Sequence, residues 1–209
     1  MTRTIVGALT VALLAPASLT AQSVRFKIDA IGMTYQEARE GRDGIGAGLG
    51  GGVEWRIKRF RFDIRALGVR VDPDSAGIPD FDVAQVDVRI GYLLTPFLAL
   101  ELGGGHRYVS PDFAAQEVGM FRLGVASENV LTRLASVWVR GAYLVNPQFS
   151  GGGSADLAFE FGLGVGVGTR NGRFRFHAEY EFQRIDRTVN TVDVPIQTSL
   201  ARTGIAIGF

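Results

Sequence analysis

The chain has 209 residues, no cysteine and a net charge of +1 from 22 lysines and arginines against 21 aspartates and glutamates. Disulfides, thiol chemistry and a lipid-modified N-terminal cysteine are therefore excluded, and the balanced charge gives no reason to expect a nucleic-acid partner. The 28 glycines and 46% hydrophobic residues are unusual for a soluble domain, yet no run beyond the N-terminus approaches the ~18 apolar residues of a spanning helix. This composition favours membrane strands.

Residues 1–21 have the pattern of a cleavable secretory signal. Arg3 gives the positive start, an apolar core follows from Ile5 to Ala15, and small residues end at Ala21, after which we expect the cut. An anchor helix is the alternative, but the core is short and Pro16 follows it. Residues 22–209 are then one domain.

Apolar residues recur at every second position through the rest of the chain, which is the period of a strand with one apolar face. The predicted apolar rows begin, in chain order, at Val24, Ile45, Phe60, Val86, Leu98, Phe121, Val137, Leu157, Phe174 and Ile196. Long and short connectors alternate between them. This predicts ten strands, with eight as the alternative if the weak strand at Phe121 is lost or merged.

Two stretches interrupt the alternation. Phe81 and Val83 are out of phase with the row that begins at Val86, so a β-bulge near Ala84 or Gln85 is expected. Residues 72–80 contain two prolines and a glycine and resemble the start of a calcium loop, but they lack its closing glutamate. We therefore expect a turn there, and no metal site.

The hairpin over residues 155–186 indicates what surrounds these strands. From Leu157 to Val167 the apolar row takes ten steps of ~3.3 Å, which at a tilt of ~45° gives a rise of roughly 24 Å. That rise matches the ~25 Å apolar band of an outer-membrane barrel and exceeds the usual strand length of soluble domains. An Asn-Gly pair at 171–172 supplies a tight turn.

The C-terminal residues Ile205, Ile207 and Phe209 alternate and end on an aromatic. This pattern resembles the C-terminal assembly signal of bacterial outer-membrane β-barrel proteins. The resemblance implies an all-β, up-and-down antiparallel transmembrane β-barrel from about Val24 onward, located in the cell outer membrane in contact with its lipid. It also implies that the closing strand is read by the barrel-assembly machinery. We expect a monomer without a cofactor.

If the apolar rows face lipid, the charged rows face the barrel interior. The reverse arrangement is prohibitive because each Arg or Lys on the lipid face near the bilayer centre costs ~2–4 kcal/mol. The predicted lumen charge network comprises Arg56, Arg61, Asp63, Arg65, Asp87, Arg89, Glu101, Arg140, Glu160, Arg175, His177, Glu179 and Glu181. The same inward rows contain Arg25, Lys27, Asp29, Glu54, Arg122 and Arg202. A barrel this narrow is filled by its own side chains, so we expect Arg-carboxylate pairs inside.

Glycines and aromatics add two further expectations. The glycine ladders over 46–52 and 162–168 either open a narrow water-filled path or make room for long arginines, for Trp138 and for strand bending. Aromatics at the strand ends predict two interfacial girdles. One girdle would contain Trp55, Phe60, Tyr92, Phe97, Phe174 and Phe209, and the other Tyr35, Tyr108 and Tyr143.

The pattern predicts a structural, adhesive or narrow-channel protein of the outer membrane, and no enzyme. One alternative is a secreted soluble barrel whose apolar rows face inward around a lipid. The other is a membrane-embedded hydrolase in which His177, beside Glu179 and Glu181, acts as a general base. No serine or threonine in this hairpin completes a nucleophile-base-acid set, so no catalytic residue is assigned.

Overall fold

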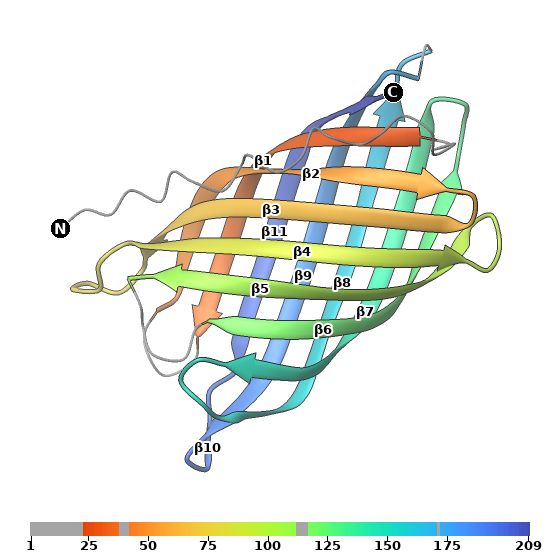
Figure 1. The fold of residues 1–209 in the computed structure, drawn as a ribbon. Coiled ribbons are helices and arrows are strands. Elements are labelled where there is room, and N and C mark those ends of the chain that lie inside the picture. Colours follow the sequence, from red (N-terminus) through yellow and green to blue (C-terminus); the bar gives the residue numbers. More distant parts are fainter. Residues whose placement is uncertain (1–22, 38–41, 112–116, 171) are drawn as a thin grey trace, which may run out of the picture.

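A single closed antiparallel barrel is formed by the residues that the computed structural model describes, which are 23–37, 42–111, 117–170 and 172–209 (Figure 1). Within these ranges ten long strands pair with their sequence neighbours, and β1 closes the barrel against β11. The strands are β1 (Ser23–Glu37), β2 (Gly44–Ile57), β3 (Phe60–Pro73), β4 (Phe81–Leu93), β5 (Leu98–Ser110), β6 (Val118–Val130), β7 (Ala135–Phe149), β8 (Ser154–Gly168), β9 (Phe174–Val189) and β11 (Ile196–Gly208). The ten-strand prediction is confirmed, and the predicted signal segment lies outside the described residues.

The connectors divide the barrel into two ends. Residues 58–59, 94–97, 131–134 and 169–173 connect strands at what we call the turn end, where β1 begins and β11 finishes. The other five connections, which follow β1, β3, β5, β7 and β9, join strand ends at the opposite end, which we call the loop end. The last of these includes β10 (Val192–Asp193), which pairs with β9. Among the described residues, no helix has the length and apolar character needed to cross a bilayer.

An apolar belt covers the outside of the barrel over the part nearer the turn end. Side chains such as Ile28, Ile64 and Leu102 project from three different strands and are 68%, 51% and 61% exposed. An exposed apolar surface that encircles a whole molecule is incompatible with water and fits the hydrocarbon of a bilayer. The apolar rows therefore face outward here, contrary to the inward orientation that a soluble lipid-binding barrel would require.

The strands are longer than the membrane needs, and their polarity inverts toward the loop end. They run for 13 to 16 residues, whereas a transmembrane strand needs ~9–11. Beyond the belt many outward side chains are polar, as at Thr34, Arg70 and Asp82, although Ile45 is exposed there, while the inward ones become apolar. These inward residues form the loop-end apolar core: Ile31, Met33, Tyr35, Leu67, Val69, Val71, Phe81, Val83, Val109, Ile196 and Leu200, with Val118, Met120, Leu144, Ala158 and Ile185 beside them.

This inversion corrects the predicted bulge in β4. Phe81 and Val83 point into the loop-end apolar core, and the registers of β4 with β3 and with β5 run without a break. The backbone alternation of β4 continues through Ala84. What changes there is that the apolar side chains point into the barrel and no longer toward lipid. Register shifts occur instead between Gly119 and Phe121 and between Ala155 and Leu157.

The inversion also corrects one member of the predicted aromatic girdles. Tyr35 points inward, where its ring packs edge-on against Phe81 with the centroids 5.3 Å apart, so it is not at a lipid interface. The remaining girdle residues lie on the outer surface: Phe60, Tyr92, Phe97, Phe174, Phe209, Tyr108 and Tyr143 are exposed and Trp55 is half-buried. Their place at a lipid interface stays a prediction.

Candidate functional site

Ion pairs fill the interior of the barrel beneath the loop-end apolar core. Arg65 lies 2.9 Å from Asp63 and 2.6 Å from Glu179. Arg122 lies 2.6 Å from Asp87 and 2.8 Å from Glu160, which also accepts a hydrogen bond from Arg89 at 2.6 Å. Arg61 pairs with Glu101. These distances are those of charge-assisted hydrogen bonds, and, except for Asp63 on the same strand as Arg65, the partners come from different strands.

Glu181 on β9 is the most heavily shared carboxylate. Its Oε1 lies 3.4 Å from Arg89, 3.6 Å from Arg65 and 3.6 Å from Arg140. Its Oε2 accepts a hydrogen bond of 3.1 Å from Arg202. The side chain is buried, so its single negative charge is shared by several arginines that have little access to water.

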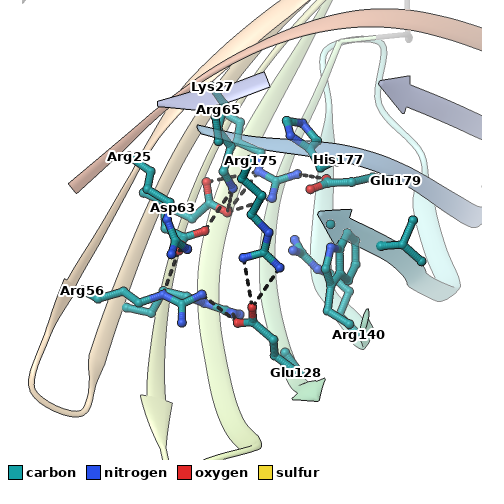
Figure 2. Close-up of a pocket in the computed structure, with 17 residues that line it drawn as sticks. Arg25, Lys27, Arg56, Asp63, Arg65, Glu128, Arg140, Arg175, His177 and Glu179 are labelled. Atoms are coloured by element: carbon teal, nitrogen blue, oxygen red, sulfur yellow. Dashed lines mark hydrogen bonds and ion pairs between the residues drawn. The ribbon is translucent and has the colours of Figure 1, made fainter. Parts of the chain in front are cut away.

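The interior opens toward the turn end as a charged vestibule (Figure 2). The cationic side chains that line it are Arg25, Lys27, Arg56, Arg61, Arg65, Arg140 and Arg175, and the carboxylates are Glu54, Asp63, Glu128 and Glu179. Glu54 faces Arg25, Lys27 and Arg56 at 3.4, 3.1 and 2.7 Å. Glu128 faces Arg56, Arg61 and Arg175 at 2.7, 3.7 and 3.4 Å. Two carboxylates therefore hold the mouth together.

A layer of one arginine and uncharged polar side chains separates the ion pairs from the loop-end apolar core. Arg107 is 1% exposed and donates to Gln85 at 3.1 Å, to Thr198 at 3.3 Å and to Gln183. Gln85 in turn donates to Asp87 at 2.7 Å, which links this layer to the ion pairs. The glutamines act as donor and acceptor together, so they suit the boundary between charged and apolar layers.

Both glycine ladders make room for neighbouring side chains. A Cβ added at Gly164 would lie 2.5 Å from the indole of Trp138, and one at Gly46 would lie 2.6 Å from Cγ1 of Val69. The guanidinium of Arg140 lies 4.4 Å from the centre of the Trp138 ring, which places an aromatic and an arginine in the space beside β8. The prediction that the missing side chains accommodate Trp138 is confirmed.

The two histidines have different surroundings. Nε2 of His177 lies 2.7 Å from Oδ1 of Asp29, inside the barrel. His106 projects outward, and its ring centre lies 4.2 Å from that of Tyr108. Among the described residues, no group of three or more histidines, aspartates or glutamates has the geometry of a metal site.

All thirteen predicted network residues point into the barrel. Ten are buried, and Arg56, Arg61 and Arg175 are half-buried at the vestibule. Glu128 and Arg107 were missed, although each continues an alternating inward row, Glu128 after Ala126 and Arg107 after Gly105. Ile205 and Phe209 are exposed, and Ile207 is half-buried. Their role in assembly stays a prediction of the resemblance.

No family model matches the sequence, and no curated protein is similar to it. The solved structure of the outer membrane protease OmpT from Escherichia coli is similar in fold, with a TM-score of 0.59, 12% identity and coverage of 93% of this chain and 99% of that chain. The chain has the fold of a bacterial outer-membrane β-barrel protein. At this identity the likeness extends to the fold of the outer-membrane barrel and not to its activity.

Two further solved structures are also similar. Neisserial surface protein A has 16% identity and a TM-score of 0.40 over 89% of this chain and 97% of that chain. Ail, the attachment invasion locus protein of Yersinia pestis, has 10% identity and a TM-score of 0.42 over 90% of this chain and 98% of that chain.

Proposed function

We propose that this protein is a sealed, monomeric barrel of the outer membrane, with a structural or adhesive role carried by its loop end. The loop-end apolar core is the observation that carries the proposal. Tyr35, Val71 and Val83 within it have no exposed surface, so water has no continuous path past them. The ion pairs beneath this core form a second barrier, since a permeating ion would have to separate paired charges.

The orientation follows from the connectors. In bacterial outer-membrane barrels the short turns face the periplasm and the longer loops face outward. The loop end then stands above the outer leaflet, which agrees with its polar exterior. Acidic residues predominate on it, including Asp72, Asp74, Asp82, Asp156 and Asp193. An acidic surface that projects from the membrane is available to basic groups on another surface.

We expect the purified protein to insert into planar lipid bilayers without giving stepwise current. Conductance would be recorded on protein whose folding is verified by its faster migration in unheated gels, with a known porin as the control for insertion. Discrete current steps that scale with the amount of folded protein would contradict the sealed barrel and favour the narrow channel.

We also propose that the protein has no hydrolytic activity. His177 is already engaged by Asp29, and its neighbours on the inward face of β9 are Arg175 and Glu179, which belong to ion pairs. A general base needs a proton donor within hydrogen-bond reach, and these partners are not nucleophiles. We expect no hydrolysis of peptide or phospholipid by the folded protein. A hydrolytic activity abolished in His177→Ala would instead identify the hydrolase.

A further inference from the structure

The vestibule carries more positive than negative charge, and its positive groups compete for few partners. Seven cationic side chains line it against four carboxylates. Glu54 and Glu128 are each shared by three of the cations, so a single negative charge faces three positive charges at each of them. We propose that the vestibule binds one small oxyanion of the phosphate type, which enters from the turn end.

Arg140 supplies an independent indication of a missing acceptor. Its side chain is 6% exposed, yet Nε and Nη1 make no hydrogen bond to any described residue, and Nη1 lies 3.6 Å from the carboxylate of Glu181. A buried guanidinium N–H without an acceptor is costly. Figure 2 shows Arg140 on the wall of the vestibule, on the side toward Arg175. The ring of Trp138 lies against its guanidinium, 4.4 Å from the ring centre to Cζ.

The space available fits one small anion. The cavity measures about 40 Å³, which is room for about three water molecules. Gly166 leaves the wall bare where the guanidinium of Arg175 lies across it. An oxyanion with several oxygens can accept from several arginines at once and also neutralises their charge, whereas a water accepts two hydrogen bonds and is neutral.

The turn end would direct anions to this cavity. The described residues of the short connectors include five cations, Lys58, Arg59, Arg133, Arg170 and Arg173, and no acidic residue. At the mouth the side chains of Arg25, Arg56 and Arg175 keep 27%, 29% and 21% of their surface exposed. A rim of positive charges raises the local concentration of anions. The site does not depend on the barrel being sealed, because anions reach it from the turn end.

The test is titration of the full-length folded protein with inorganic phosphate. Isothermal calorimetry would be done in an uncharged, phosphate-free detergent at low ionic strength. We expect Arg175→Gln and Arg25→Gln each to weaken phosphate binding about tenfold or more, since each removes a charge-assisted donor. Arg70→Gln, which removes an exposed arginine at the loop end, should leave binding unchanged. Gel mobility before heating establishes that all variants are folded.

A second arm distinguishes free phosphate from a lipid headgroup. Phosphatidylglycerol added to the micelles would be counted on the protein by native mass spectrometry, with Arg175→Gln and the rim variant Arg133→Gln. Lipid binding lost in Arg175→Gln and displaced by phosphate supports the site with a headgroup as the source. Lipid binding affected only by Arg133→Gln, together with phosphate binding lost in Arg175→Gln, supports a free oxyanion. No phosphate binding by the unaltered protein, or equal binding by Arg175→Gln and Arg70→Gln, would overturn the proposal.

Discussion

Replacing Glu181 by leucine should lower the free energy of unfolding by about 3–5 kcal/mol, the cost of leaving buried charges without their partner. The carboxylate is within 3.6 Å of four arginines, so its loss exposes several cations to mutual repulsion in a site with little water. The measurement is equilibrium urea unfolding in lipid vesicles, followed by tryptophan fluorescence.

A double replacement separates the cost of an unpaired charge from the value of the pair. In Glu181→Leu with Arg202→Leu both members of one pair are apolar, and we expect the double variant to lose less stability than the sum of the two single variants. Arg70→Gln serves as the matched control, because the pair that it removes, with Asp80, is exposed. A loss below about 1 kcal/mol for Glu181→Leu would contradict the account of the interior as an interdependent ion-pair network.

Replacing Ile64 by arginine should destabilise the folded barrel in a bilayer by about 2–4 kcal/mol. Ile64 projects outward from β3 in the apolar belt, between Val53 of β2 and Val88 of β4. An arginine there would place its charge in hydrocarbon. The free energy of unfolding in vesicles measures the effect.

The same substitution beyond the belt is the control. Thr34 also projects outward, from β1, but nearer the loop end, between Ser199 of β11 and Ile45 of β2. Thr34→Arg should therefore change stability by no more than about 0.5 kcal/mol. If both arginine variants lose the same amount of unfolding free energy, the membrane boundary lies elsewhere. If neither variant loses stability, the result argues against a lipid belt.

The number of strands and the direction of most side chains could be predicted because a strand in a bilayer obeys one rule. Lipid requires an apolar exterior over many residues, so the alternation that begins at Leu157 or Phe174 is long and unbroken. The same rule predicts that Arg65, Glu160 and Glu181 point into the barrel, and all three are buried there. Their partners were not predictable, because an inward position does not say which of nine other strands faces it.

The errors have one physical cause. The prediction from the sequence assumes that apolar residues face outward along the whole strand. This assumption no longer holds where a strand extends beyond the membrane. Phe81, Val83 and Tyr35 are apolar or aromatic residues that point inward above the bilayer, so a bulge was expected at the first pair and a lipid interface at the third. The turn predicted over residues 72–80 begins later for the same reason, because β3 continues to Pro73.

Accessibility along one strand tests the central claim most directly. The chain has no cysteine, so single cysteines can be introduced without background. In lipid vesicles, with a water-soluble maleimide on both sides, we predict rapid labelling of Thr34→Cys and Gln36→Cys and no labelling of Ile28→Cys until the protein is denatured. Labelling of Ile28→Cys as fast as that of Thr34→Cys would contradict a barrel whose outside meets lipid near the turn end and water near the loop end.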